Sequence, residues 1–210
     1  MVFLFKVWAL KILEGWMTKN LTQEDFINAA KILRCDVAAI KAVAEVESSG
    51  NGFLIDETIK VLFEGHVFYK YTNGRFKNSD PTLCYPNWTR EFYAKGATAD
   101  IRGHKEWNRL QSAMALDDNA ALMSASYGKF QIMGFNYVHC GFKSINDFFM
   151  VMQVNEGEQI KAFCKYIQDV GLDDELRKHS WGDFAHKYNG PDYKKNKYDL
   201  KLAAAWVKYA

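Results

Sequence analysis

The fold is decided by the stretch Ala44-Glu45-Val46-Glu47-Ser48-Ser49-Gly50-Asn51-Gly52-Phe53. Its two glutamates differ in helical phase. Glu47 lies seven residues after Ile40 and four after Val43, which places it on the apolar face of the preceding helix. Glu45 lies four residues after Lys41 and is expected to form a solvated ion pair with it. The pattern therefore predicts that Glu47 is the carboxylate directed inward, at the end of its helix.

An inward carboxylate at the end of a helix is suited to acid catalysis. Burial and the negative end of the helix dipole both disfavour ionisation. A general acid in glycoside hydrolysis must still carry its proton near neutral pH, when it donates to the leaving oxygen. The glycines after Glu47 let the chain turn and let a bulky substrate approach. The alternative is a purely structural glutamate that pairs with an arginine elsewhere in the chain.

Two later runs of polar residues have the composition of turns between helices. The first is Ser124-Ala125-Ser126-Tyr127-Gly128-Lys129-Phe130-Gln131-Ile132-Met133-Gly134. The second is Lys187-Tyr188-Asn189-Gly190-Pro191. Each run alone is weak evidence for a functional site, since polar turns between helices are common.

Taken together and in this order, the three runs resemble the lysozyme-like superfamily, in particular goose-type lysozymes and soluble lytic transglycosylases. The chain is most similar to the N-acetylmuramidase domain of phage endolysins, in which a run like Leu62-Phe63-Glu64-Gly65-His66-Val67-Phe68 follows the first motif. The resemblance extends from about Leu21 to Ala210 and does not include residues 1–16. It implies a lysozyme-like fold, bacterial peptidoglycan as the substrate, and cleavage between N-acetylmuramic acid and N-acetylglucosamine.

The resemblance also implies roles for individual residues. Glu47 matches the general acid of the superfamily. Five side chains match positions that line the cleft or face the sugar, where polar groups can bind N-acetyl and hydroxyl groups: Ser126, Tyr127, Gln131, Tyr188 and Asn189. Ser126 and Tyr127, with Gly128, would form the turn that brings this block to the floor of the cleft.

A second carboxylate is needed if water is the nucleophile. The base of an inverting enzyme lies roughly 6.5–9.5 Å from the acid, and the nucleophile of a retaining enzyme lies roughly 5–5.5 Å from it. Glu64 is the first candidate because it shares a short motif with His66, although an ion pair with His66 or a lysine is an equal alternative. The family often has an arginine at the position of Gly65, so a charge partner of Glu64 is absent here. The other candidates are Asp56, Glu57 and Asp100.

The fold class predicted from residue 17 onward is α+β, mainly α: one lysozyme-like helical domain with a small β or loop lobe. Helix starts are indicated by residues that can cap a first turn: Thr22, Asp36, Asp117 or Asp118, Ser144, Asn155 and Ser180. One helix is expected to stop at Gly171, and the last to span about Asp199 to Tyr209. Residues 50–103 contain turn signals, and alternation between Ile59 and Tyr71 is typical of a strand, although a helix also fits.

Composition excludes several classes of function. A formal net charge of +2 on 210 residues does not favour nucleic acid as a partner. The four cysteines form no C-x-x-C pair and are expected to be free thiols, and His66 has no second ligand at a metal-binding spacing. We expect no metal, no cofactor and a monomeric enzyme.

The N-terminal residues 1–16, MVFLFKVWALKILEGW, form a separate apolar segment. It is shorter than the roughly 20 residues that span a bilayer, and it lacks the cleavage site of a signal peptide. We expect a weakly amphipathic helix that packs on domain 17–210 or engages outer-membrane lipid or lipopolysaccharide. Without a signal peptide, the protein is expected in the host bacterial cytoplasm before lysis, and to act on the periplasmic cell wall. The rivals are a lytic transglycosylase and a non-enzymatic membrane-disrupting protein that acts through this helix.

Overall fold

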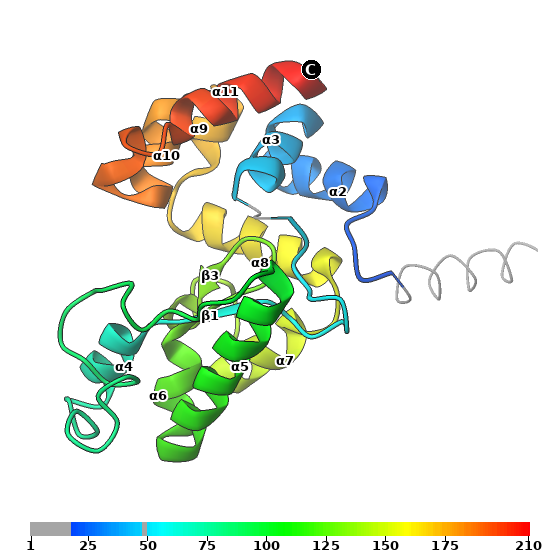
Figure 1. The fold of residues 1–210 in the computed structure, drawn as a ribbon. Coiled ribbons are helices and arrows are strands. Elements are labelled where there is room, and N and C mark those ends of the chain that lie inside the picture. Colours follow the sequence, from blue (N-terminus) through cyan, green and yellow to red (C-terminus); the bar gives the residue numbers. More distant parts are fainter. Residues whose placement is uncertain (1–17, 48–49) are drawn as a thin grey trace, which may run out of the picture.

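The chain forms two groups of elements joined by one central helix. The computed structural model describes residues 18–47 and 50–210, with the backbone alone at Glu47. In Figure 1 the helices α2, α3, α9, α10 and α11 form an upper lobe, and α4 to α7 with a small sheet form a lower lobe. Helix α8 (Glu156–Asp169) lies between the two lobes. This mainly helical architecture with a small sheet confirms the predicted fold class, while the predicted N-terminal helix falls in residues 1–17, outside the described residues.

The upper lobe brings the C-terminus of the chain onto its first helices. Its elements are α2 (Gln23–Leu33), α3 (Val37–Glu47), α9 (Asp173–Arg177), α10 (Trp181–Asn189), the 3-10 helix η2 (Pro191–Lys194) and α11 (Tyr198–Tyr209). The capping box predicted at Thr22 is confirmed, because its backbone N–H donates to Asp25 Oδ2 (2.8 Å) and its hydroxyl oxygen accepts from Asp25 N (3.2 Å).

Helix α11 packs along α3, and this contact corrects the ion pair expected at Glu45. Glu45 Oε2 accepts from Lys208 Nζ (2.6 Å) and from the Tyr209 hydroxyl (2.5 Å), both on α11. Lys41 instead places its ammonium over the rings of Phe26 (5.7 Å) and Tyr209 (5.6 Å). The expected pair of Glu45 with Lys41 is wrong because a neighbouring helix, invisible to local spacing, supplies better partners.

The lower lobe contains an antiparallel sheet with the strand order β1-β2-β3. Its elements are β1 (Val61–Phe63), α4 (Gly65–Tyr71), α5 (Ala99–Leu116), α6 (Asp118–Met123), β2 (Ala125–Tyr127), β3 (Ile132–Met133), the 3-10 helix η1 (Gly134–Asn136) and α7 (Ile145–Met152). The alternation between Ile59 and Tyr71 is a strand only over β1. From Gly65 the alternative of a helix is correct, because it carries Phe68 into the core between Phe63 (5.6 Å) and Phe76 (5.7 Å).

Most of the predicted helix boundaries are confirmed by side-chain caps. The side chains of Asp36, Asp117, Ser144 and Asn155 accept from backbone N–H groups at the starts of α3, α6, α7 and α8. The cap expected from Ser180 is wrong, since its hydroxyl donates to Asp183 Oδ2 (2.8 Å) and caps no N–H. The chain leaves α8 through Gly171, with a φ of +67°.

Two global features complete the fold. Cys35, Cys84, Cys140 and Cys164 are free thiols, as predicted. Within residues 18–47 and 50–210, no helix has both the length and the apolar character that crossing a membrane requires.

Candidate functional site

The small sheet separates the predicted site residues into two groups. Side chains alternate between the two faces of a strand, and residues paired across antiparallel strands share a face. Leu62 pairs with Ser126, and both line a hollow on the surface. Phe63 and Tyr127, from the alternate positions, are fully buried in the core. One face of the sheet therefore belongs to the core and the other forms the floor of a surface cleft.

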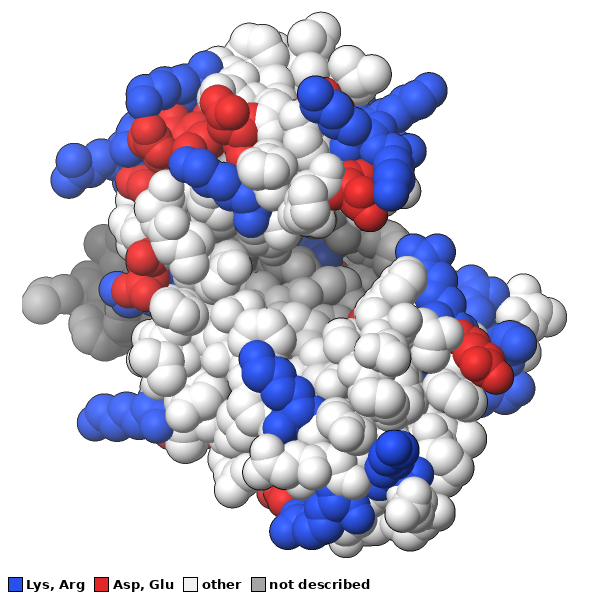
Figure 2. Space-filling view, turned by 90° about the vertical axis from the view of Figure 1, so that its left-hand side faces the viewer, with Lys and Arg blue, Asp and Glu red and all other residues white. Residues whose placement is uncertain are grey.

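The cleft consists of two adjoining hollows of about 400 Å³ each, which share Leu62 and Gln131. Figure 2 views the molecule from the side on which the surface is hollowed between the two lobes; most of the described side chains facing the hollow are uncharged, and both basic and acidic side chains stand around it. One hollow, the aromatic end, is lined by Ser126, Gln131, Tyr166, Tyr188, Asn189 and Tyr198 among others. The other, the basic end, is lined by Leu54, Lys60, Tyr93, Ala94, Arg102 and Glu106 among others.

Ser126 and Gln131 form a fixed pair on the floor of the cleft. The Ser126 hydroxyl donates to Gln131 Oε1 (2.8 Å), and Gln131 Nε2 donates to Gly128 O (2.8 Å). Gly128 has a φ of +67°, and a Cβ there would lie 2.4 Å from the side chain of Gln159, so only glycine fits. Gln131 itself has a φ of +47°, which is uncommon for a residue with a side chain. The turn thus holds the Gln131 amide at the junction of the two hollows.

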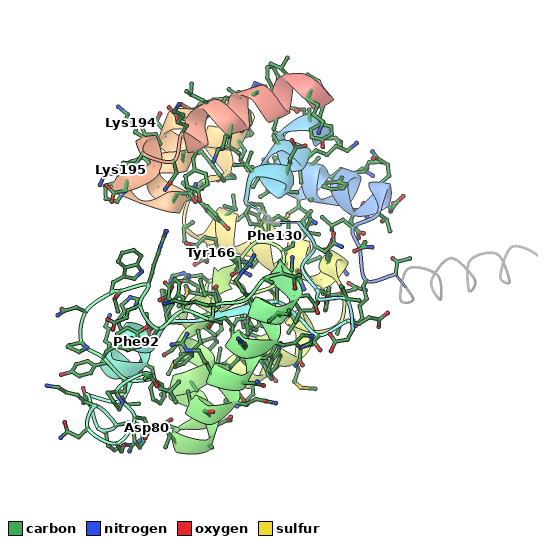
Figure 3. All side chains as sticks on the ribbon, in the orientation of Figure 1. Asp80, Phe92, Phe130, Tyr166, Lys194 and Lys195 are labelled. Atoms are coloured by element: carbon green, nitrogen blue, oxygen red, sulfur yellow. The ribbon has the colours of Figure 1, made fainter. Side chains whose placement is uncertain are left out.

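Tyr188 and Asn189 reach the cleft from the opposite lobe, at the end of α10. The Tyr188 hydroxyl donates to Phe130 O (3.2 Å), and its ring packs against Phe184 (5.4 Å) and Tyr166 (6.1 Å). Figure 3 shows Phe130 and Tyr166 where the two lobes meet. Four of the five predicted sugar-binding residues, from runs about 60 positions apart, are therefore brought together around one hollow.

Tyr127 is the fifth predicted sugar-binding residue, and its position does not suit that role. Its side chain is fully buried, its hydroxyl donates to Leu122 O (2.9 Å), and its ring meets Phe148 and Phe149 edge-on, at 5.6 Å each. Its neighbour Ser126 faces the cleft, and strand alternation turns Tyr127 to the other face. We correct the prediction and assign Tyr127 to the core.

Glu47 is the last residue of α3, and its side chain lies outside the described residues, as do Ser48 and Ser49. The predicted inward carboxylate therefore stays a prediction. The chain is described again from Gly50, whose φ of +101° confirms that a glycine is needed for the turn. Lys129 Nζ donates to Gly50 O (3.1 Å), so this segment lies beside the turn that leads to Gln131.

The segment after Glu47 is also attached to the start of α8. Gly52 N donates to Glu156 Oε1 (2.6 Å), and Glu156 is 1% exposed. A Cβ at Gly52 would lie 2.4 Å from Gln159 Oε1 and 2.8 Å from Lys129 N. The close approach that this glycine permits is therefore to α8 and the Gly128–Lys129 turn.

Glu64 stands at the start of α4, on the same face of the strand as Leu62 by alternation. Its side chain is 13% exposed; Oε1 accepts from the Tyr93 hydroxyl (2.6 Å), and Oε2 lies 3.3 Å from His66 Nδ1. Burial and the hydrogen bond to Glu64 raise the pKa of Tyr93, so its hydroxyl remains a donor. The predicted ion-pair partner His66 is thus adjacent, while Tyr93 was not predicted.

At Gly65, where the family often has an arginine, the surrounding packing leaves no room for a side chain. A Cβ there would lie 2.3 Å from Tyr85 Cε1 and 2.6 Å from Leu83 O. The segment that carries Leu83 and Tyr85 therefore occupies the space a side chain would need. Tyr93, from the same long connection, takes the place of a charged partner for Glu64.

The other candidates for a second carboxylate do not line the cleft, although Asp100 directly follows Ala99, which does. Asp56 and Asp100 flank His104, with distances of 3.8 and 3.4 Å from its Nε2. Glu57 lines a separate hollow together with His104 and Trp107. Asp56, Glu57 and Asp100 are not among the residues that line either end of the cleft. Glu64 does not line it either, but its carboxylate accepts a hydrogen bond from Tyr93, which does.

Comparison with known proteins identifies the family. The sequence model of the muramidase family, described as N-acetylmuramidase, matches residues 36–210. The chain belongs to the N-acetylmuramidase family. The crystal structure of the Burkholderia AP3 phage endolysin is similar to this muramidase with a TM-score of 0.80 and 35% sequence identity, over 91% of this chain and 71% of that one. No curated protein matches the chain. These findings confirm the resemblance to phage endolysin muramidases and support a peptidoglycan hydrolase.

Several residues of the muramidase site could not be read from the motifs. Tyr93 and Arg102 lie in or next to the irregular region 72–98, where nothing in the sequence indicates a contact with β1. Glu156 carries only the signal of an acidic residue in the first turn of a helix, which is typical of a solvated position. Its burial becomes apparent only when the segments from Leu21 and Gly52 are seen to donate to it.

Proposed function

We propose that this muramidase hydrolyses the β-1,4 bond between N-acetylmuramic acid and N-acetylglucosamine, with Glu47 as the general acid. The observation that carries the proposal is the convergence of Ser126, Gln131, Tyr188 and Asn189 on one hollow. Hydroxyl and amide groups of this kind suit the N-acetyl and hydroxyl groups of an amino sugar. Family membership supports the same substrate.

In the proposed reaction, Glu47 gives its proton to the bridging oxygen and the bond to the anomeric carbon breaks. Positive charge then develops on the sugar ring, as in other glycoside hydrolases. Glu64 takes a proton from the water that attacks the anomeric carbon, and the second sugar leaves with the proton from Glu47. Tyr93 orients the Glu64 carboxylate through a hydrogen bond to Oε1, and His66 Nδ1 lies 3.3 Å from Oε2.

The test is the rate of turbidity loss of purified peptidoglycan for the wild type and Glu47→Gln. Glutamine keeps the size of the side chain and cannot donate the proton, so we expect a loss of at least ~10²-fold. Glu45→Gln is the matched control, two residues away and bound to Lys208 on the surface. Circular dichroism checks the folding of both variants. A folded Glu47→Gln enzyme with wild-type activity would overturn the proposal.

A lytic transglycosylase is the second candidate, and the position of Glu64 favours keeping it. Glu64 is not among the residues lining either hollow, and its Oε1 is already engaged by Tyr93. Without a base at the reaction centre, the 6-hydroxyl of the sugar would attack in place of water. Mass spectrometry of the products separates the two reactions, because only the transglycosylase forms 1,6-anhydro ends.

We further propose that the enzyme is held in the host cytoplasm until lysis and acts on the wall from the periplasm, as a monomer. Residues 1–16 would contact outer-membrane lipid or lipopolysaccharide. Deleting them should abolish leakage from lipopolysaccharide-containing vesicles and leave the turbidity assay unchanged; leakage that survives the deletion contradicts this role. If Glu47→Gln still kills bacteria as the wild type does, the non-enzymatic rival is favoured.

A further inference from the structure

The long connection between α4 and α5, residues 72–98, carries an exposed tryptophan. In Figure 1 this connection stands out from the lower lobe around α4. Trp88 is 58% exposed, and among the described residues no other tryptophan is exposed to this degree. Single exposed apolar residues are common and need no explanation by themselves. Trp88 differs from such residues in how firmly the protein holds it and in its connection to the cleft.

The segment that carries Trp88 is fixed at both of its ends. The ring of Tyr85, before it, packs against the ring of Phe92, after it, with 4.9 Å between the centroids. Figure 3 shows Phe92 on this side of the lower lobe. Two residues further on, Ala94 N donates to the buried carboxylate of Glu106 (2.6 Å). A segment held in this way loses little conformational freedom when a ligand arrives, which lowers the cost of binding.

The indole of Trp88 is itself held by two neighbours. The guanidinium of Arg90 lies over the ring, 5.5 Å from its centroid. Burial and the bond to Glu64 raise the pKa of Tyr93, and a hydrogen bond from Trp88, whose indole can only donate, opposes them. Tyr93 in turn donates to Glu64 Oε1 (2.6 Å) and lines the basic end of the cleft. Trp88 is therefore joined to the cleft through one residue.

The substrate is a polymer that extends beyond the cleft. Each hollow has a volume of about 400 Å³, whereas a glycan strand of peptidoglycan continues for many sugars. Sugars outside the hollows lie on the surface next to them. A pyranose ring has a face of C–H groups that packs on a flat aromatic ring while its hydroxyl groups stay in water, and tryptophan offers the largest such ring.

We propose that Trp88 is the platform of an outer sugar subsite next to the basic end, on which one N-acetylhexosamine of the strand stacks where the strand leaves the cleft. This inference deepens the proposed function and rests on it for the identity of the substrate. The contact is made through the C–H face of the sugar and requires no peptide. Because the same indole donates to Tyr93, the subsite adjoins the residue that orients Glu64.

The experiment measures binding of peptide-free glycan fragments of two and of eight sugars by calorimetry, in the Glu47→Gln background so that no cleavage intervenes. Trp88→Ala removes the platform, whereas Trp88→Phe keeps a flat ring and removes the N–H that donates to Tyr93. Met150→Ala removes an exposed apolar side chain from α7 that lines neither end of the cleft, and is the matched control. Circular dichroism confirms that each variant is folded.

We expect Trp88→Ala to weaken binding of the eight-sugar fragment about tenfold, since a well-packed tryptophan is among the strongest contributors to an interface. Trp88→Phe should stay within about twofold of the parent, because most of the stacking surface remains. Neither variant should change binding of the two-sugar fragment, which fits within the hollows, and Met150→Ala should change nothing. The fluorescence that Trp88→Phe removes from the parent should be protected from acrylamide by the eight-sugar fragment.

An undiminished affinity of Trp88→Ala for eight sugars, an equal loss on both lengths, or a Phe variant as weak as Ala would overturn the platform. Vesicles of phosphatidylglycerol test the membrane as an alternative: binding that Trp88→Ala abolishes, with unchanged affinity for glycan, would assign the ring to lipid. The proposed function is tested separately by turbidity. A wild type that cleaves no peptidoglycan refutes the function, whereas a cleaving enzyme whose Trp88→Ala variant binds eight sugars normally refutes only the platform.

Discussion

Replacing Glu156 should disconnect the segment that follows the proposed acid. One buried carboxylate accepts from Leu21 N (2.9 Å) and Gly52 N (2.6 Å) and lies 3.3 Å from Lys129 Nζ. It therefore joins the start of the described chain, the segment after Glu47 and the turn before Gln131. Glu156→Ala removes the acceptor of all three groups and leaves the two N–H groups and the ammonium without it, in a region with little access to water.

The expected cost follows from those contacts. An orphaned buried donor costs about 1–3 kcal/mol, and breaking a buried ion pair costs about 3–5 kcal/mol. These terms overlap because one carboxylate serves all three groups, so we expect about 4 kcal/mol for Glu156→Ala. Glu156→Gln keeps one oxygen as an acceptor and should cost about 2 kcal/mol. Either value is a large part of the roughly 5–15 kcal/mol that stabilises a typical domain.

Urea denaturation followed by circular dichroism measures the change in the free energy of unfolding. The sharper test is a double-mutant cycle with Lys129→Met, because removing the ammonium also removes the uncompensated charge. The double variant should be more stable than the sum of the single losses predicts, by about 1–2 kcal/mol. A Glu156→Gln protein with the wild-type urea midpoint, or a coupling energy near zero, would refute the reasoning.

Three further outcomes are expected. Tyr93→Phe removes the hydrogen bond that orients Glu64, so kcat on peptidoglycan should fall about tenfold with KM little changed; an unaltered kcat would argue against Glu64 as the base. Burial raises the pKa of Asp36, but hydrogen bonds, first that from His179, outweigh it and hold the pKa below its usual value. Asp36→Asn should therefore lower Tm at pH 7, with the difference shrinking below about pH 4, where the wild-type carboxylate gains its proton; thermal melts across pH check this. Tyr127→Phe should lower the free energy of unfolding by about 1 kcal/mol, measured by urea denaturation, and leave KM unchanged, since its hydroxyl donates within the core. A raised KM would indicate that Tyr127 contacts the substrate.

Local signals in the sequence were sufficient for much of the helical architecture. Thr22, Asp36, Ser144 and Asn155 cap helices where expected, because the bonds involved span only three residues. The helix that ends at Glu47 was predicted for the same reason, since apolar spacing and a following glycine are local properties. Ser180 shows where such local prediction fails. Its hydroxyl donates to the side chain of Asp183 and accepts from no backbone N–H, and the spacing of the two residues alone does not distinguish this bond from a helix cap.

Contacts between distant segments could not be predicted in this way. The partner of Glu45 comes from a helix more than 160 positions away, so the nearby Lys41 was the only visible candidate. The motif, taken as one unit, predicts that Tyr127 lies in the cleft. A three-residue strand turns alternate side chains to opposite faces, and the presence of that strand was not apparent from the motif.

The start of α8 shows why the separate motifs act as one site. Glu156 accepts from Gly52 within the first motif, and Gln159 Oε1 accepts from Lys129 N (2.7 Å) within the second. One turn of a single helix thus fixes the position of the first motif relative to the second, and the glycines at 52 and 128 permit this because neither has room for a Cβ against Gln159. The glycines of the motifs are therefore required by the packing against α8, and the spacing between acid and cleft floor depends on that packing more than on either motif alone.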